Sequence, residues 1–353
     1  MNFKREFANL ENILMNMNKI NIDGFEVGGD KTYVIAEIGS NHNQSFDLAL
    51  ESVDAAKESG ANAVKFQSLN VDKLYLNPSD SIKELHKRID LQEEWHQKLN
   101  DYCIKKEITF HSTPTYMESI DILEQLNVKL YKLASAQIGT FPQLVNKVAS
   151  LGKPTIFSTG LTSLSDLDQV VDIFEKNNNP NYIILHCNSI YPAPYDKINL
   201  KLIETYQKRY GKIIGFSDHS DGIATAIAAV SLGAKVIEKH FAIDRKLPVP
   251  DAPFSLEPDE FKDLVEGIRI AELAVNERDR NEIEKEESAF KQQILYRLVS
   301  KNRIEKGSTL KQEDLQYLRN PNGIDCRFEA DYLGRNLKET VKSNTLITED
   351  LLH

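Results

Sequence analysis

Two lysines lie inside apolar stretches of the sequence, where a charged side chain is unusual. Lys65 occurs in AVKFQ and Lys132 in YKLAS. An unpaired ammonium in such a setting costs several kcal/mol to desolvate, so each lysine should meet an anion. Either a structural carboxylate, such as Glu37 or Glu238, pairs with each lysine, or the two together bind a phosphate or a compact phosphorylated carboxylate.

Hydroxyl groups accompany these lysines and favour the second alternative. Three serines stand in comparable segments: Ser135, Ser158 and Ser217. Ser158 is followed by Thr159-Gly160 and then by a segment with a helical pattern. Because the first N–H groups of a helix bind anions, we expect that helix to complete the anion site.

Two histidines could bind a divalent metal. His219 occurs in SDHS and His240 in EKHF, and two imidazoles with open positions for water and substrate suit Mn²⁺, Fe²⁺, Co²⁺ or Zn²⁺ as a Lewis acid. A pair of hydrogen-bonded structural histidines is the alternative, since no HExxH or CxxC spacing occurs. His42, in SNHN, is a candidate third ligand or substrate contact. Three others are predicted to be surface residues: His86, His96 and His353.

Eight short apolar or β-branched segments carry these residues, and segments of helical pattern separate them. The eight segments are 32–39, 62–68, 108–113, 129–135, 154–160, 182–188, 212–220 and 235–241. In SFDLALESVDAAKESGA, apolar residues recur every three or four positions and Gly60 follows as a C-cap. Eight such units fit a (β/α)8 barrel better than an open sheet, because closure removes the edge strands.

Polar side chains stand late in all eight segments, where a barrel builds its active site. They are Glu37, Lys65, Gln67, Ser112, Thr113, Lys132, Ser135, Ser158, His186, Asn188, Ser217, Asp218, His219, Glu238 and His240. A barrel end packed only for stability would hold branched apolar residues instead. The pattern predicts a site for a polar small molecule.

The composition bounds the class of protein. With 41% hydrophobic and 27% charged residues the chain reads as a soluble globular protein, and its net charge of −10 argues against nucleic-acid binding. Its three cysteines predict reduced thiols of a cytosolic protein. The sequence shows neither a signal-peptide pattern nor an apolar run of about 18 residues, so we expect a cytoplasmic protein without a membrane span.

Composition also suggests how the chain divides. The charged stretch ERDRNEIEKEESAFKQQ predicts a solvated helix or connector. Further on, TLKQEDL at 309–315 recurs 36 residues later as TLITEDL at 345–351, which predicts a small module with two similar halves. The predicted division is an N-terminal extension (1–30, a capping hairpin or a loose arm), the barrel (31–276), a linker (277–293) and the small module (294–353).

Together these motifs resemble the sialic acid synthase family, which includes the legionaminic and pseudaminic acid synthases. These transferases condense phosphoenolpyruvate with an N-acetylated amino sugar to a nine-carbon 2-keto acid. The likeness runs from Tyr33 to His353, and its motifs are AEIGSNHN, AVKFQ, HSTP, YKLAS, FSTG, HCNSIYPAP, GFSDHS and IEKHF. The tail resembles the family's antifreeze-like (SAF) module, a small and mostly β domain of the β-clip type.

The resemblance implies roles for individual residues. His219 and His240 would bind Mn²⁺, with Mg²⁺ or Co²⁺ as alternatives. Phosphoenolpyruvate would be held by Lys65, Lys132, Ser135, Ser158 and Ser217. The sugar and metal region would be lined by Glu37, Gln67, Thr113, Asn188, Ser189, Tyr191, Glu238 and Asp251, with Glu37 or Glu238 handling protons. Arg319 would reach the neighbouring subunit's sugar in a domain-swapped homodimer.

The sequence departs from the family pattern on the sugar side. Gln137 replaces a glutamate of the neuraminate-forming members, Ser189 an asparagine and Val249 a glycine. One altered polar partner can change discrimination strongly. The sequence therefore leaves two candidates for the sugar substrate, N-acetylmannosamine and a 2,4-diacetamido-trideoxyhexose.

Three other functions compete with this interpretation. A Schiff-base aldolase would form an imine on Lys132 or Lys65 and need no metal. A synthase acting on a phosphorylated sugar would need a second basic cluster, for which Arg245 and Lys246 are the candidates. A barrel that has lost its activity would serve as a binding or scaffold protein, although decay should have erased the reactive residues.

Overall fold

The computed structural model describes residues 19–275 and 281–353. The chain divides into two compact units, Met1–Asn276 and Glu277–His353.

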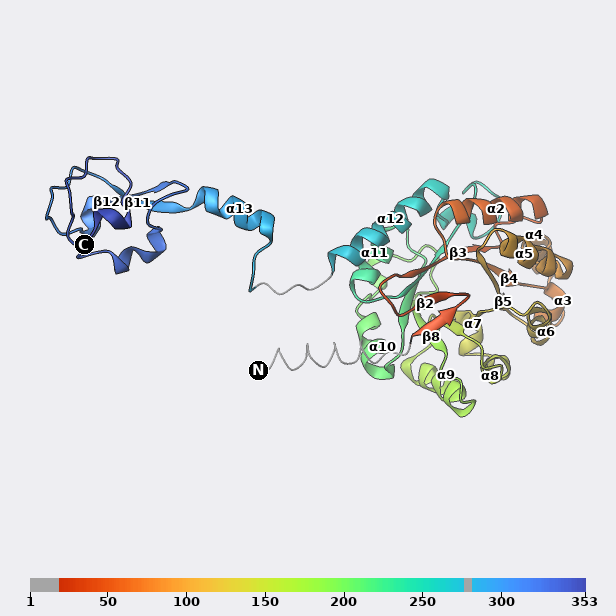
Figure 1. Ribbon diagram of the computed structural model, residues 1–353. Helices are drawn as coiled ribbons and strands as arrows, with labels where there is room; N and C mark the ends of the chain where they lie inside the picture. Colours follow the sequence, from red (N-terminus) through yellow and green to blue (C-terminus); the bar gives the residue numbers. More distant parts are fainter. Residues whose placement is uncertain (1–18, 276–280) are drawn as a thin grey trace. The chain divides into compact units, whose positions relative to one another are not determined.

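Eight parallel strands form the first unit (Figure 1). They are β3 (Tyr33–Gly39), β4 (Ala63–Ser68), β5 (Thr109–Pro114), β6 (Tyr131–Leu133), β7 (Thr155–Ser158), β8 (Tyr182–Cys187), β9 (Ile214–Asp218) and β10 (Val236–His240). The order in the sheet is β5-β4-β3-β10-β9-β8-β7-β6, and β5 also contacts β6, which closes the sheet into a barrel. The predicted TIM barrel is thus confirmed, with a strand in each of the eight predicted segments.

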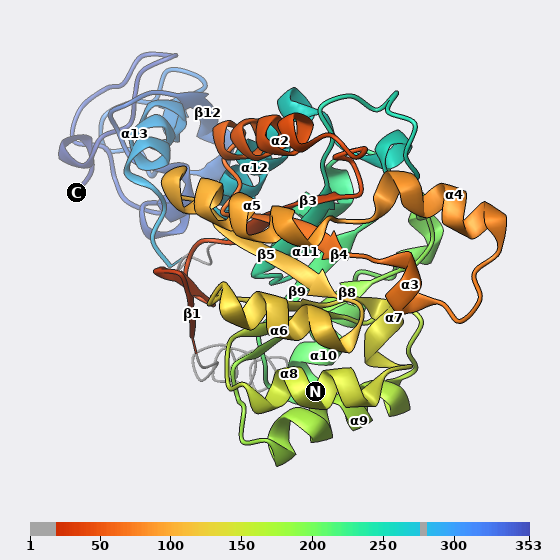
Figure 2. The ribbon, with the colours of Figure 1, turned by 90° about the vertical axis from the view of Figure 1, so that its right-hand side faces the viewer.

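Helices surround the strands on the outside (Figures 1 and 2). They are α2 (Phe46–Glu58), α3 (Val71–Leu74), α4 (Asp80–Ile89), α5 (Glu93–Lys105), α6 (Met117–Gln125), α7 (Ser135–Ile138), α8 (Pro142–Ser150), α9 (Leu164–Lys176), α10 (Leu202–Tyr210), α11 (Ala224–Ser231) and α12 (Pro258–Ala274), with 3-10 turns η1 (Tyr195–Lys197) and η2 (Ala252–Phe254). In α2, the Ser45 hydroxyl accepts from the N–H of Leu48, and Ala49, Val53 and Ala56 form the buried face. Within the described residues, no helix has the length and apolarity needed to cross a membrane.

Successive side chains along each strand point alternately toward the surrounding helices and into the barrel. In β3, Val34, Ala36 and Ile38 pack in the apolar layer beneath the helices. Tyr33 and Ile35 belong instead to the apolar cluster inside the barrel, and the next residue of that face is Glu37. The barrel interior is therefore apolar at the N-terminal end of the strands and polar at the C-terminal end.

A hairpin closes the apolar end of the barrel. Strands β1 (Ile20–Ile22) and β2 (Phe25–Val27) pair antiparallel, and Ile20, Ile22 and Val27 join the interior cluster. Of the two alternatives for the N-terminal extension, the capping hairpin holds for residues 19–30, while residues 1–18 lie outside the described part.

The variant Ile22→Ala tests this hairpin. Ile22 is fully buried in the interior cluster, so its truncation is expected to lower the free energy of unfolding by about 2 to 5 kcal/mol. Urea unfolding measures the effect, with exposed Glu26→Ala on the same hairpin as the control. Equal stability of the two variants would show that the hairpin adds nothing to the barrel.

The second unit is small and built around short strands. It holds α13 (Lys285–Ile294), β11 (Tyr296–Ser300), β12 (Leu315–Arg319) and the 3-10 turns η3 (Gln312–Asp314), η4 (Cys326–Asp331) and η5 (Glu349–Leu351). β11 pairs antiparallel with β12. The core consists of Leu298, Ile304, Leu310, Leu315, Ile324, Leu337, Val341, Ile347 and Leu352. Its assignment as an SAF module stays a prediction.

The predicted internal repeat is present with a different register. The turn η3 lies between buried Leu310 and Leu315, and η5 lies between buried Ile347 and Leu352. The equivalent positions are thus 37 residues apart, and the spacing of 36 taken from the matching letters was wrong by one residue. The buried leucine and isoleucine side chains determine which positions of the two halves are equivalent in the structure. The exposed acidic residues, which the sequence comparison aligned, lie one position out of this register.

Candidate active site

A cavity of about 780 Å³ opens among residues at the C-terminal ends of the barrel strands. Most of the predicted site residues line it: Glu37, Lys65, Gln67, Thr113, Lys132, Ser135, Ser158, Ser189, Tyr191, Ser217, His219, Glu238, His240 and Asp251. Asn188 does not; its amide donates to the carbonyl of Lys197. Arg319 belongs to the second unit, where its guanidinium lies 5.3 Å from the ring centre of Tyr296.

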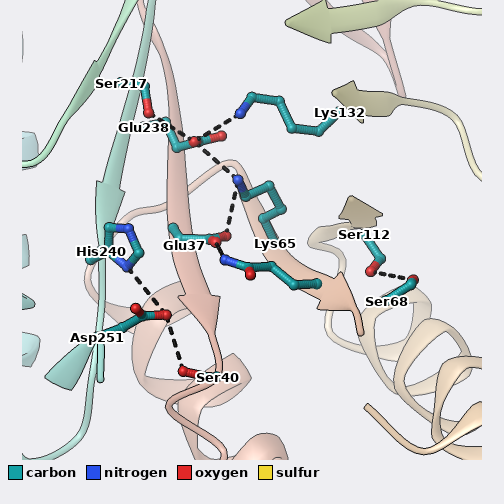
Figure 3. Close-up of polar contacts among 11 residues, drawn as sticks. Glu37, Ser40, Lys65, Ser68, Ser112, Lys132, Ser217, Glu238, His240 and Asp251 are labelled. Atoms are coloured by element: carbon teal, nitrogen blue, oxygen red, sulfur yellow. Dashed lines mark hydrogen bonds and ion pairs between the residues drawn. The ribbon is translucent and has the colours of Figure 1, made fainter. Parts of the chain in front are cut away.

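The two predicted lysines share one carboxylate oxygen (Figure 3). Glu238 Oε1 accepts from Lys65 Nζ at 3.0 Å and from Lys132 Nζ at 3.1 Å. The Ser217 hydroxyl donates to the same oxygen at 3.0 Å. Lys65 Nζ also lies 3.3 Å from Glu37 Oε2, and the Gln67 amide donates to Glu37 Oε1 at 2.6 Å. Buried carboxylates are therefore the anions that meet the lysines within the protein.

Pairing and burial set the charges of this cluster. Burial opposes ionisation, but the ammoniums of Lys132 and Lys65 hold the pKa of Glu238 far below its usual range. Lys65 is buried too, yet its two carboxylate neighbours raise its pKa. Lys132 has one such neighbour, and burial lowers its pKa. Burial raises the pKa of Glu37 to about 7. Glu37 is thus the carboxyl of the cluster that can gain or lose a proton near neutral pH.

Several polar oxygens in the cavity are buried and free to bind a ligand. Ser158 Oγ, Thr113 Oγ1 and Gln137 Oε1 have no hydrogen-bond partner in the described part of the chain. The first residues of α7, Ser135 to Gln137, also line the cavity. The helix expected after Ser158 does not, because α9 begins only at Leu164 and a capping box of Ser163 with Asp166 closes its N-terminus. That part of the predicted anion site was wrong.

The two predicted metal ligands lie at the ends of neighbouring strands, His219 directly after β9 and His240 as the last residue of β10, with ring centres 5.3 Å apart. His219 Nδ1 lies 2.7 Å from the carbonyl oxygen of Asn188. This bond places the proton on Nδ1 and leaves Nε2 with its lone pair. His240 Nδ1 is buried without a hydrogen-bond partner, 4.0 Å from Asp251 Oδ2.

These two imidazoles fit a metal that takes its remaining ligands from water or substrate. Burial, with the nearby ammonium of Lys65, holds the pKa of His240 well below its usual range, so its ring is neutral as a ligand requires. Across residues 19–275 and 281–353, no group of three or more His, Cys, Asp or Glu side chains could hold a metal ion.

Three other histidines differ from their predicted roles. His42 is fully buried between Phe66 and Trp95, and it is not among the residues that line the cavity. His86 and His96, predicted as surface residues, are buried. His96 accepts from the Ser68 hydroxyl, and His86 lies 2.5 Å from an oxygen of Asp90. Local polar partners satisfy these rings inside the helical layer, which the sequence pattern did not reveal. His353 is exposed, as predicted.

Residues 52–280 match the NeuB family. This chain belongs to the NeuB family. It is 34% identical over 334 residues to the N,N'-diacetyllegionaminic acid synthase of Campylobacter jejuni, covering 90% of this chain and 99% of the relative. It is 32% identical over 333 residues to the pseudaminic acid synthase of the same species, covering 90% and 96%.

A solved structure agrees with this membership. The N-acetylneuraminic acid (sialic acid) synthetase of Leptospira borgpetersenii, solved with citrate, has a TM-score of 0.72 and 32% identity. The match covers 78% of this chain and 96% of that one. The resemblance stated from the strand-end motifs is thus confirmed at the level of the family, whose relatives here are nonulosonic acid synthases.

Cys187 and Phe254 are among the cavity residues of this NeuB family member that were not predicted. Cys187 Sγ lies 3.8 Å from His219 Nδ1 and 3.7 Å from Ser135 Oγ. Strand alternation could have revealed Cys187, because it follows the interior residues Ile183 and Leu185 at a spacing of two. Phe254, whose ring centre is 5.0 Å from that of His240, comes from η2. No sequence pattern could have revealed Phe254, because it lies in a loop after the last barrel strand and not at a strand end.

Proposed function

We propose that this protein condenses phosphoenolpyruvate with an open-chain N-acetylated hexosamine, giving a nine-carbon 2-keto acid and phosphate. The observation that carries the proposal is the pairing of two sites in one cavity. Lys65 and Lys132 face the cavity beside unpaired hydroxyls, and His219 and His240 face it with available ring nitrogens. An anionic substrate and a metal-dependent electrophile need such a combination.

The lysines bind and orient the phosphate and carboxylate of phosphoenolpyruvate. Ser135 and Ser158 add hydroxyl donors from α7 and β7. The nucleophilic C3 of phosphoenolpyruvate attacks the sugar aldehyde, water adds at C2, and the tetrahedral intermediate loses phosphate by cleavage of the C–O bond. The ammoniums of Lys65 and Lys132 stabilise the charge on the departing phosphate.

Proton handling falls to Glu37, whose carboxyl has a pKa of about 7 and can gain or lose a proton near neutral pH. The Gln67 amide donates to Glu37 Oε1 and thereby orients the carboxyl group. His219 and His240 would hold a divalent metal, most simply Mn²⁺, which when bound supplies a Lewis acid for the aldehyde oxygen.

The C-terminal unit belongs to the same proposal. An SAF module would place Arg319 in the partner's site of a swapped homodimer. The observation that supports this arrangement is that the Arg319 side chain is exposed at the end of β12.

A diacetamido sugar is the favoured acceptor. The name of the Campylobacter jejuni N,N'-diacetyllegionaminic acid synthase supports a substrate with two acetamido groups. Gln137 supports it as well, because its amide carries both a donor and an unpaired acceptor at the cavity. An amide N–H can donate to an acetamido carbonyl, which a carboxylate cannot do.

Gln137→Glu tests this preference. The variant is expected to shift the ratio of kcat/KM toward N-acetylmannosamine over a 2,4-diacetamido-trideoxyhexose by at least about tenfold, since the donor is lost. Phosphate release with each sugar measures the ratio, and Gln97→Glu on the outer helix α5 is the control. An unchanged ratio would remove Gln137 from sugar recognition.

The reaction itself is tested by phosphate release from phosphoenolpyruvate. EDTA-treated protein with Mn²⁺ restored is incubated with N-acetylmannosamine and, in parallel, with 2,4-diacetamido-trideoxyhexoses. Metal-dependent release with one sugar is expected, and mass spectrometry then identifies the product. No release with any sugar from folded, Mn²⁺-binding protein would contradict the condensation.

The Schiff-base aldolase stays as the second candidate because of one observation. Burial lowers the pKa of Lys132, and an amine with a lowered pKa is the form that attacks a keto acid. Borohydride in the presence of pyruvate would then fix a mass increase on Lys132. The condensation predicts no such adduct.

A further inference from the structure

A second pair of charged residues lies directly behind the two histidines. Asp218 and Lys239 are ladder partners on β9 and β10, each one residue before a histidine. Lys239 Nζ lies 2.9 Å from Asp218 Oδ2, and both side chains are fully buried. By strand alternation they point away from the cavity, into the layer between strands and helices.

This ion pair organises the chain on both sides of His219. Asp218 Oδ1 accepts from the N–H of Ser220 at 2.8 Å and from the Ser220 hydroxyl at 2.7 Å. Lys239 Nζ donates to the carbonyl oxygen of Ser220. The Thr225 hydroxyl, on α11, donates to Asp218 Oδ2 at 2.9 Å. The residues before and after His219 are therefore bonded to each other and to the residue before His240.

Stability alone does not account for this arrangement. Desolvating two charges costs several kcal/mol, and an apolar pair of similar volume is usually at least as stable. What the ion pair adds is a fixed register between two strand ends and the turn at Ser220. The distance between two imidazoles on neighbouring strands depends on that register.

We infer that Asp218 and Lys239 are positioning residues that hold His219 and His240 at the spacing for one divalent cation. The inference rests on the proposed metal site. It assigns the ion pair no contact with substrate, and the lysines of the anion site do not depend on it.

The double variant D218N/K239M separates positioning from folding. It removes both charges at nearly constant volume and keeps an acceptor for the Ser220 N–H. The matched control is K212M/E175Q, which removes a lysine–glutamate pair at the other end of β9, where Lys212 Nζ lies 3.4 Å from Glu175 Oε1. Electron paramagnetic resonance of free Mn²⁺ gives the metal affinity, and calorimetry in EDTA gives the affinity for phosphoenolpyruvate.

The expected result is a loss of Mn²⁺ affinity of about tenfold or more in D218N/K239M. Its affinity for phosphoenolpyruvate should stay within about twofold of wild type, as should both affinities of the control. Mn²⁺ affinity equal to wild type in folded D218N/K239M would overturn the inference. Equal losses for Mn²⁺ and phosphoenolpyruvate would also overturn it, because they indicate general damage.

Two further arms keep the test decisive. If D218N/K239M does not fold, Thr225→Val removes only one bond to Asp218, and it should weaken Mn²⁺ binding by at least about twofold; unchanged binding would overturn the inference. If wild type itself binds no Mn²⁺, the proposed metal site fails and the inference fails with it. Wild type that binds Mn²⁺ but releases no phosphate contradicts the proposed reaction and leaves the positioning result standing.

Discussion

Lys65→Met is expected to lose condensation activity by about a thousandfold and to lower the free energy of unfolding by about 3 to 5 kcal/mol. The activity falls because an ammonium that stabilises the departing phosphate is gone. The stability falls because Lys65 lies 3.0 Å from Glu238 and 3.3 Å from Glu37, and its loss leaves two buried carboxylates without their shared cation. Phosphate release and urea unfolding measure the two effects.

Comparison with Lys132→Met sharpens this prediction. Lys132 lies 3.1 Å from Glu238 and pairs with no second carboxylate among the described residues. Its replacement should reduce activity about as much as that of Lys65 but destabilise the fold less. Lys153→Met is the control, since Lys153 pairs with Glu124 outside the cavity. Activity of Lys65→Met within tenfold of wild type would exclude Lys65 from holding the substrate.

Glu238→Gln is expected to lower the free energy of unfolding by about 3 kcal/mol, and inorganic phosphate should restore much of the loss. The variant leaves Lys65 and Lys132 facing each other without the negative charge that both contact through Oε1. A bound phosphate replaces that charge and stabilises the folded state by mass action. Phosphate should raise the Tm of the variant by about 3 °C more than that of wild type.

Thermal unfolding with and without phosphate checks this expectation, at constant ionic strength set with chloride. Glu124→Gln is the matched control, because Glu124 also faces a lysine but does not line the cavity. Equal phosphate effects on wild type and Glu238→Gln would mean that phosphate does not bind between the two lysines.

The sequence predicted the barrel because its eight strands are short, β-branched and regularly spaced. It predicted the cavity because reactive side chains fall late in all eight segments, near the strand ends. The sequence did not show whether an individual side chain at a strand end points into the barrel or away from it. His186, counted among the strand-end groups, faces outward and stacks on Phe216, with Nε2 2.5 Å from the carbonyl oxygen of Ile198. Ser112 bonds to Ser68 away from the cavity.

Buried polar residues account for most of the remaining errors. His96 lies on α5, with Nδ1 3.2 Å from the carbonyl oxygens of Gln92 and Glu93. These backbone partners are three and four residues away and exist only once the helix has formed. A charged or polar residue in a helical segment is therefore not necessarily exposed to solvent, because the hydrogen bonds that allow its burial form only in the folded protein.

The bond network around Glu238 has a kinetic consequence. Its carboxylate is tethered beside both ammoniums, so any phosphate that binds there must compete with a ligand already present at high effective concentration. In the proposed reaction, the departing phosphate would leave both ammoniums to regain their own carboxylate, which would weaken product inhibition by phosphate. Under the proposed reaction, such an internal counterion would lower the affinity for phosphoenolpyruvate and would speed the release of phosphate at the end of each cycle.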